Sequence, residues 1–333
     1  MRLGRKLLSI LWAGLLAFVI LFFGQFVWGS LLLLNLRVTP KIPWSVAAMA
    51  LVLWAIWQYL GGRWWPRRTQ EIRRRNLRAL AVSGRTFFWT MAAAICSIAA
   101  LSGLWIVLFQ ISRTPPNALG DIARYPLTTV IPVLLMSCLA APFSEEPAFR
   151  GYVQSILERS FPVPAAIVLS SALFAAAHLT YGFYWTKLTV YFLFGVVCAL
   201  AAHLARSIVP VIAGHSLADL TFFTLVWPHD ASRRLVSEGG ADMWFWIHVS
   251  QVLIFAALAV WCFRRLASAT RAPASSTMSA SDFFDDVIFS DNFLIRMQRY
   301  AGSNCLPRRI VLTFSQARQE QRAVTELVCA FTR

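Results

Sequence analysis

Long apolar segments alternate with shorter polar segments along most of the chain. Because a bilayer offers no hydrogen-bond partner to a backbone N–H or C=O, helix is the conformation expected within each apolar segment. Each segment approaches the roughly 20 residues that a spanning helix needs. The pattern therefore predicts an all-α polytopic membrane protein with about eight transmembrane helices, at residues 7–34, 42–60, 87–111, 127–157, 162–180, 188–204, 208–227 and 243–263.

The first and fourth predicted spans are longer than one straight crossing requires. Residues 7–34 carry no charge, and the run exceeds the apolar region of about 7–15 residues in a secretory signal, so we expect a retained and tilted span. Residues 127–157 would form a helix roughly 45 Å long at about 1.5 Å per residue. We therefore expect a break or tilt in it near Pro142 or Pro147.

The same pattern divides the chain into four parts. The second part differs from the others because it holds most of the ionisable residues found within apolar sequence. The parts are N-terminal spans with a basic loop at 61–86 (1–124), a core with embedded charges (125–227), a last transmembrane helix (243–265), and a linker with a poorly defined tail (266–333).

Composition agrees with a membrane protein. Hydrophobic residues make up 58% of the 333 residues, charged residues 14%, and the mean hydropathy is +0.60. Soluble domains are typically about 45–50% apolar and about 25% charged. The composition thus excludes an ordinary soluble protein.

Positive charge is concentrated in the basic loop. Between Arg63 and Arg85, both included, the chain has eight arginines and one acidic residue, Glu71, and the whole chain has a net charge of +16. The positive-inside rule predicts that this loop is cytoplasmic, and both termini with it. We expect the arginines to contact anionic lipid headgroups, and no nucleic acid partner is expected.

Two adjacent glutamates stand in the fourth predicted span. A carboxylate inside a bilayer is costly, and such residues are usually functional. Glu146 and Arg150 are four residues apart, share a helix face and are predicted to pair. Glu145 lies about 100° around the helix. It is left to face a cavity as a candidate general base.

Two later spans carry histidines in short motifs. Phe174 and His178 share one helix face, and the three alanines between them allow a neighbouring helix to approach closely. His215 and Asp219 are also four residues apart and can face one cavity. Each histidine alone could be a hydrogen-bonded core residue. Their order after the glutamate pair favours a shared site.

The sequence Glu-Glu-x-x-x-Arg, then Phe-x-x-x-His, then His-x-x-x-Asp resembles the signature of the CPBP family. This family comprises the type II CAAX prenyl endopeptidases and their bacterial relatives. The motifs lie at 145–150, 174–178 and 215–219, on predicted helices four, five and seven, and make 125–227 a CPBP-like catalytic core. The resemblance implies a CAAX-like intramembrane endopeptidase in a bacterial plasma membrane, with a peptide or membrane-protein substrate.

The resemblance also implies a role for each residue. Glu145, with His178, would activate a water molecule for attack on a peptide carbonyl. His215 and the side chain of Asp219 would form the oxyanion site. Amide hydrolysis needs both parts, a base for the water and donors for the developing oxyanion. The residues that would support this site are Glu146, Arg150 and Phe174.

The last motif departs from that of the eukaryotic prenyl proteases, which carry Asn where this chain has Asp219. An ionised aspartate cannot donate a hydrogen bond to an oxyanion. We therefore expect either that Asp219 is protonated or that it orients His215, which then donates.

Two alternative functions fit the same residues. Glutamate, histidine and aspartate are acceptable zinc ligands, so a metal-dependent membrane peptidase is one alternative. The sequence lacks His-Glu-x-x-His and any Cys-x-x-Cys pair, and no cofactor is expected on the leading interpretation. The other alternative is a non-catalytic membrane scaffold or immunity factor, because a fold does not fix a function.

Overall fold

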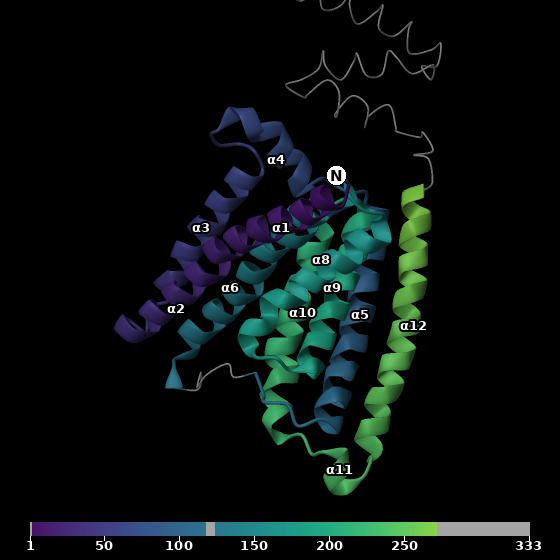
Figure 1. Cartoon of the computed structure of the whole chain (residues 1–333). Coiled ribbons are helices and arrows are strands. Elements are labelled where there is room, and N and C mark those ends of the chain that lie inside the picture. Colours follow the sequence, from purple (N-terminus) through teal and green to yellow (C-terminus); the bar gives the residue numbers. More distant parts are fainter. Residues whose placement is uncertain (1, 118–123, 272–333) are drawn as a thin grey trace, which may run out of the picture. The chain divides into compact units, whose positions relative to one another are not determined.

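Helices make up every regular element in the computed structural model, which describes residues 2–117 and 124–271 (Figure 1). The prediction of an all-α fold is confirmed. From residue 272 onward, the predicted linker and tail lie outside the described residues. The elements are α1 (Arg2–Leu21), η1 (Phe22–Phe26), α2 (Val27–Val38), α3 (Trp44–Leu60), η2 (Arg67–Thr69), α4 (Gln70–Leu77), α5 (Gly84–Ile111), α6 (Leu127–Glu146), η4 (Pro147–Val153), α7 (Gln154–Glu158), α8 (Val163–Ala177), η5 (His178–Tyr181), α9 (Trp185–Ala205), α10 (Val209–Thr221), η6 (Phe222–Val226), η7 (Trp227–Ser232), α11 (Val236–Gly239) and α12 (Met243–Arg271).

Seven helical segments of the described chain are long and apolar enough to cross a membrane. They correspond to seven of the eight predicted spans. The remaining apolar helix, α3, has 17 residues. At about 1.5 Å per residue this is roughly 26 Å, at the lower limit for a span. The chain is an integral membrane protein with an all-α polytopic fold.

The first predicted span is one long helical segment with a π-helical turn in the middle. The backbone stays helical at Leu21 and Val27, on either side of η1. A π-turn is rare and is often found at functional sites. Gly24 in this turn lies against Ser144 of α6, and a Cβ atom at Gly24 would overlap the Ser144 side chain. The glycine therefore permits the close approach of η1 and α6.

The fourth predicted span is irregular where the sequence suggested. Helix α6 contains Pro132 and Pro142, a π-helical segment η4 begins at Pro147, and α7 continues to Glu158. Proline removes a backbone donor and crowds the preceding turn, which accounts for a change in helix type at this point. The expected continuation of the helix beyond Arg150 is confirmed.

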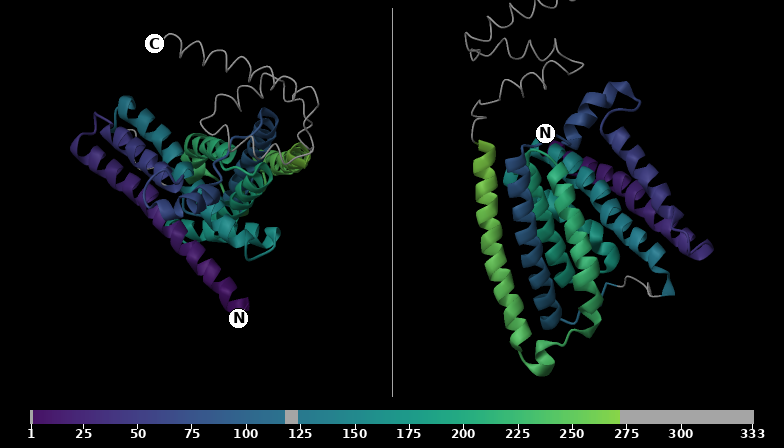
Figure 2. Two further views of the ribbon diagram at one scale, coloured as in Figure 1. Left: turned by 90° about the horizontal axis from the view of Figure 1, so that it is seen from above. Right: turned by 180° about the vertical axis from the view of Figure 1, so that it is seen from behind.

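The helices pack as neighbours that are often distant in sequence. Helix α12 lies along α5, α8 packs against α9, and α6 contacts both α3 and α10 (Figures 1 and 2). Helix α1 runs obliquely across η4. The segment α6–η4–α7 therefore contacts helices from both halves of the sequence. Its later part, from Ser144 through η4 to Leu157, is buried, while Ile131 and Leu135 in the first part of α6 are exposed.

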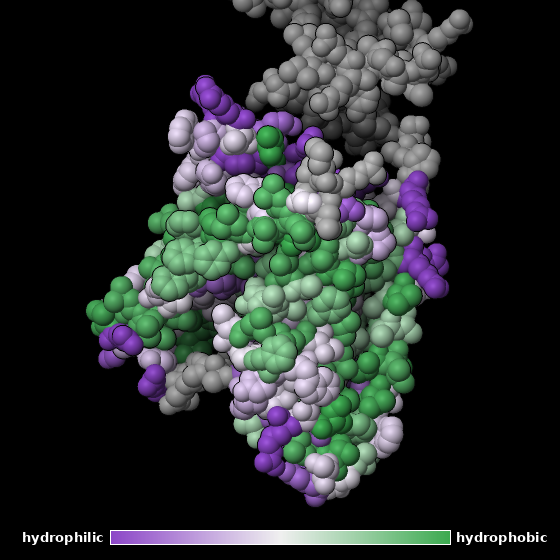
Figure 3. All heavy atoms as spheres, viewed as in Figure 1, coloured by the Kyte–Doolittle hydropathy of each residue, from purple (hydrophilic) through white to green (hydrophobic). Residues whose placement is uncertain are grey.

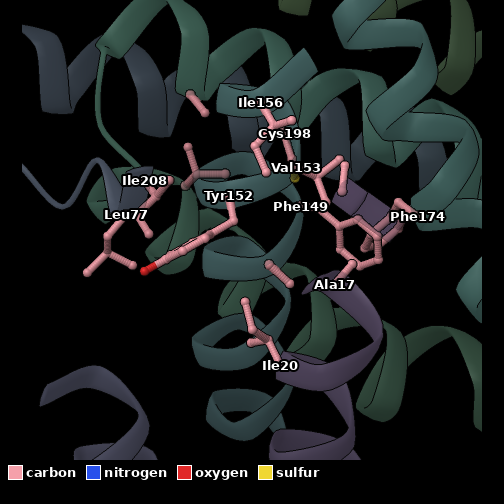
Figure 4. Packing of buried hydrophobic residues seen from close by; sticks show 14 of the residues in the cluster. Ala17, Ile20, Leu77, Phe149, Tyr152, Val153, Ile156, Phe174, Cys198 and Ile208 are labelled. Atoms are coloured by element: carbon pink, nitrogen blue, oxygen red, sulfur yellow. The ribbon is translucent and has the colours of Figure 1, made fainter. Parts of the chain in front are cut away.

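The largest cluster of buried hydrophobic residues surrounds η4 (Figure 4). Phe149, Tyr152 and Val153 of η4 pack against Ile20 of α1 and Leu77 of α4. Tyr152 also donates a hydrogen bond from its hydroxyl to the carbonyl of Leu60, at 3.1 Å. These contacts hold the irregular segment in place from three directions.

The basic loop contains a short helix, α4. Arg67, Arg68, Arg74 and Arg75 are exposed, as the prediction of headgroup contacts requires. Arg73 is the exception, because it is buried and its guanidinium donates hydrogen bonds to the carbonyl of Tyr59 at the end of α3 and to those of Trp64 and Pro66 in the loop. Arg73 therefore orders the loop and is not one of the arginines available to lipid headgroups.

The first and last described helices share one end of the helical unit. Figures 1 and 2 show the start of α1, helix α4 and the end of α12 at that end. On the face shown in Figure 3, hydrophilic residues gather at the two ends of the unit and apolar residues cover most of its middle. This distribution suits a membrane-spanning unit. The cytoplasmic side of both termini and the bacterial plasma membrane remain predictions.

Helix α12 extends past the predicted end of the last span at residue 265 and reaches Arg271. Alanine favours helix, and the hydroxyls of Ser268 and Thr270 each bond to a carbonyl four residues earlier. Leu266 in this stretch is fully buried. The composition of 266–271 suggested a linker, and the packing of Leu266 keeps it helical.

Candidate active site

All four predicted catalytic side chains line a single cavity of about 990 Å³. Glu145 comes from α6, His178 from η5, and His215 and Asp219 from α10. Phe174, a predicted supporting residue, also lines the cavity. Three motifs that are dispersed over 75 residues of sequence, Glu145 to Asp219, therefore meet at one place in the fold.

Glu146 and Arg150 form a buried ion pair beside this cavity, as predicted. Arg150 Nη1 lies 3.1 Å from Glu146 Oε1, and both side chains are completely buried. Arg150 also donates to the carbonyl of Gly195 and lies 4.3 Å from the centre of the Phe174 ring. The pair thus joins the α6–η4 helix to α8 and α9, which is a supporting position.

His215 is oriented by Glu146 rather than by Asp219. The distance between His215 Nδ1 and Glu146 Oε1 is 2.6 Å, a strong hydrogen bond in which the ring N–H donates to the carboxylate. His215 Nε2 lies 3.6 Å from Asp219 Oδ1, beyond ordinary hydrogen-bond length. Glu146 accordingly has two partners, since it holds Arg150 and fixes the His215 ring.

Glu145 accepts a hydrogen bond from a residue in the N-terminal part of the chain. The amide of Gln25, in the π-turn η1, donates to Glu145 Oε1 at 3.1 Å. The other oxygen, Oε2, lies 3.8 Å from His215 Nε2. The carboxylate is 8% exposed at residue level, so it reaches the cavity while most of it is enclosed. One oxygen is fixed and the other is free to accept a proton.

His178 has a defined tautomer. Its Nδ1 lies 2.8 Å from the carbonyl oxygen of Phe174, which can only accept, so Nδ1 carries the proton. The Nε2 lone pair is then available on the cavity side. Tyr191 stacks on the imidazole with ring centres 4.2 Å apart. In the described residues no hydrogen bond joins His178 to Glu145, and the two face the cavity from separate helices.

Asp219 contributes an unpartnered oxygen to the site. Its Oδ2 is buried without a hydrogen-bond partner among the described residues. An unsatisfied buried acceptor is costly, and such groups are typical of functional sites. Asp219 thus lines the cavity with one carboxylate oxygen that has no partner among the described residues.

Sequence reasoning missed Gln25 and Tyr191. Gln25 had a weak signal, since it is a polar residue next to Gly24 in an otherwise apolar predicted span. Tyr191 had no sequence signal, because an aromatic residue in an apolar helix cannot be distinguished by sequence from an ordinary core residue. Both were assigned to the site only by contacts between distant helices.

Within residues 2–117 and 124–271, one group of side chains has ligand atoms close enough together for a metal ion. The atoms of Glu146, Cys198 and His215 lie within 4.8 Å of one another and are buried. Zinc accepts all three ligand types. However, Glu146 Oε1 already accepts from both His215 and Arg150, and the guanidinium would repel a bound cation. The donor set fits zinc by type, while its charge environment opposes it.

The region that forms the cavity matches a protein family. Residues 127–221 match the family model described as Type II CAAX prenyl endopeptidase Rce1-like. This segment is Rce1-like. The match runs from the first residue of α6 to the last residue of α10 and includes all three motifs, so it confirms the resemblance drawn from them. The Rce1-like family is one of membrane proteases, and its members act on peptides or proteins.

Some residues that line the cavity lie outside the Rce1-like segment. Gln25 precedes it by about 100 residues, and α5 and α12 also lie outside it. No curated protein matches the chain, and no solved structure matches it.

Proposed function

We propose that this protein is a CAAX-like intramembrane endopeptidase that hydrolyses a peptide bond with water activated by Glu145 and His178. The observation that carries the proposal is the cavity, in which Glu145, His178, His215 and Asp219 converge within an Rce1-like segment. The substrate class is a peptide or a membrane protein.

The geometry supports one assignment of proton transfers. A water in the cavity donates to Glu145 Oε2 and to the Nε2 lone pair of His178, and its oxygen attacks the peptide carbonyl carbon. His215 Nδ1–H already donates to Glu146, so His215 offers Nε2–H to the developing oxyanion in its doubly protonated form, which the Glu146 carboxylate stabilises. Asp219 donates as well when it is protonated. Glu145 then passes its proton to the leaving amine as the C–N bond breaks, so water is added across the peptide bond.

The proposal is tested with purified protein in liposomes and a mixture of internally quenched peptides. His178→Ala is expected to lower the cleavage rate by about 100-fold or more, because it removes an acceptor for the attacking water. His203→Ala is the matched control, since His203 contacts Glu158 and does not line the cavity. Equal cleavage by wild type and His178→Ala would refute the proposed mechanism. No cleavage of any peptide by wild type would instead favour a non-catalytic scaffold or immunity factor.

A metal-dependent peptidase is the second candidate, favoured by the cluster of Glu146, Cys198 and His215. If that cluster bound a catalytic ion, a chelator and Cys198→Ala would each abolish cleavage. On the leading proposal no cofactor is needed, and cleavage persists in both cases at close to the wild-type rate. The metal content of the active protein, measured by elemental analysis, separates the two.

Gln25 is expected to act as a positioning residue for Glu145. Gln25→Leu removes the donor to Glu145 Oε1 and should lower kcat about tenfold with little change in KM, because a hydrogen bond to a charged group contributes about 1.5–3 kcal/mol. Gln58→Leu makes the same change at a side chain that contacts Arg63, outside the cavity. A kcat for Gln25→Leu within twofold of the Gln58→Leu value would contradict this role.

We also propose that the basic loop contacts anionic lipid headgroups. Its exposed arginines and the exposed indole of Trp65 (83% exposed) suit the charged interface of a membrane. Mass spectrometry of lipid retained by the purified protein tests this, with Arg67, Arg68, Arg74 and Arg75 replaced by Gln. Unchanged retention of anionic lipid would exclude the contact.

A further inference from the structure

Lys187 is a buried cation in the wall of the cavity. It is 3% exposed and lies in the first turn of α9, after the N-cap residue Tyr184. The same cavity is lined by Glu145 and His178, so Lys187 shares one space with the proposed catalytic groups. The mechanism proposed above makes no use of it.

Among the described residues, Lys187 has no ion-pair partner, and its Nζ lies 5.3 Å from the centre of the Tyr184 ring. The amino-terminal end of a helix carries a partial positive charge, which disfavours a cation there. No carboxylate among the described residues lies within 4.0 Å of its Nζ. Its hydrogen-bond partner is Asn117 Oδ1, at 2.5 Å, so two of the three ammonium donors have no hydrogen-bond partner in the described structure.

Asp230 is the acidic residue that faces this region, and it is already engaged. Its carboxylate accepts from Arg233 Nε at 3.0 Å and from the indole of Trp105 at 3.0 and 3.1 Å. Arg233 is the ion-pair partner of Asp230, so Asp230 attracts Lys187 only from beyond ion-pair distance. Burying an unpaired charge costs several kcal/mol or more, unless a ligand supplies the opposite charge.

A short chain of contacts connects Lys187 to the candidate catalytic histidine. Asn117, which accepts from Lys187, donates from its amide to the hydroxyl of Tyr191 at 3.2 Å. Tyr191 in turn stacks on His178. Because the Tyr191 oxygen accepts from Asn117, its own proton is available to an anion. The groups around Lys187 are thus fixed relative to the proposed site of water attack.

We propose that Lys187, with Tyr191 beside it, forms an anion subsite that binds a carboxylate of the peptide substrate. The inference rests on the proposed endopeptidase function, and it adds that the enzyme prefers substrates with a negative charge at this subsite. The carboxylate is either the carboxyl terminus of the substrate or the side chain of an aspartate or glutamate near the cleaved bond. Either carboxylate supplies a negative charge opposite Lys187 and acceptor oxygens for the two ammonium donors that have no partner among the described residues.

The two sources are distinguished with the peptide that wild type cleaves best from the quenched mixture. It is synthesised with a free carboxyl terminus, with a terminal amide, and with each Asp and Glu replaced by Asn and Gln. Loss of the bound carboxylate should lower kcat/KM about tenfold to a hundredfold, mainly through KM, since hydrogen bonds to charged groups contribute that much. The peptide that loses activity identifies the source.

Replacement of Lys187 tests the residue itself. In Lys187→Met the difference between the carboxylate peptide and its neutral counterpart should disappear, and Lys187→Arg should restore part of it. Lys41→Met is the matched control, because Lys41 is exposed and lies outside the cavity. An equal preference for the carboxylate in wild type and Lys187→Met would overturn the proposal.

Asp121 provides the competing explanation, since it follows Asn117 by four residues in the sequence. If Asp121 is the counter-ion of Lys187, wild type will cleave charged and neutral peptides equally well, and the proposal fails. Asp121→Asn should then lower the unfolding midpoint as much as Lys187→Met does. On the anion-subsite proposal, Asp121→Asn keeps the wild-type preference for a carboxylate.

A measurement without turnover separates failure of the subsite from failure of the endopeptidase function. Two probe pairs are added to Glu145→Gln protein, and the thermal unfolding midpoint is recorded. N-acetyl-Ala-Leu and its amide test a terminal carboxylate, and the amides of N-acetyl-Glu-Leu and N-acetyl-Gln-Leu test a side-chain carboxylate. In at least one pair the carboxylate should raise the midpoint more than its neutral counterpart, and the difference should vanish when Lys187→Met is added. Equal effects within both pairs would overturn the subsite even if peptide cleavage by wild type is established.

Discussion

Glu145→Gln is expected to abolish peptide cleavage while leaving the fold intact. Glutamine has the shape of glutamate but cannot accept the proton of the attacking water, and loss of a general base lowers kcat by about 100- to 10,000-fold. The amide can still contact Gln25, so the packing between η1 and α6 should persist. Initial rates on the quenched peptides, with wild-type protein at matched concentration, measure the effect.

The control for this variant is Glu71→Gln, which makes the same change on the exposed surface of α4. It should cleave at the wild-type rate. Circular dichroism of both variants must show wild-type helix content, so that a lost rate reports chemistry. If Glu145→Gln cleaves within twofold of Glu71→Gln, Glu145 is not the base and the proposed mechanism is wrong.

Arg150→Met is expected to destabilise the protein more than any surface substitution. The side chains of Arg150 and Glu146 are both completely buried, and removal of one partner leaves an uncompensated charge. Breaking such a pair typically costs about 3–5 kcal/mol. The loss should appear as a lower midpoint of thermal unfolding in detergent, followed by circular dichroism.

A double variant separates the charge from the packing. Glu146→Gln combined with Arg150→Met removes both charges, and it should unfold at a higher temperature than Arg150→Met alone, since no buried charge is left unpaired. Arg74→Met, at an exposed arginine of α4, should leave the midpoint unchanged. A wild-type midpoint for Arg150→Met would show that the ion pair does not support the site.

The fold was largely predictable because a bilayer restricts the choice of structure. Apolar segments near span length can only be helices there, and the structure has a helix at each of the eight positions. Pro142 and Pro147 also indicated an irregularity in the fourth span, where η4 was found. The extension of α12 to Arg271 was missed because the packing of Leu266, rather than composition, maintains the helix there.

Part of the site could also be predicted. Residues four apart on a helix share a face whatever the fold, so the pairing of Glu146 with Arg150 followed from spacing alone. The convergence of Glu145, His178 and His215 was suggested by a family resemblance. The partner of each nitrogen and oxygen was not predictable, and the orientation of His215 by Glu146 instead of Asp219 is one example.

The sequence by itself determined the helical membrane fold, the basic loop and the motifs that carry the ionisable groups, because these depend on local spacing and on the cost of charge in an apolar medium. Only the tertiary structure showed that Gln25 contacts Glu145, that Tyr191 stacks on His178, and that Lys187 lines the same cavity. These relations join helices that are distant in sequence. Their geometry depends on how whole helices pack, which no local pattern encodes.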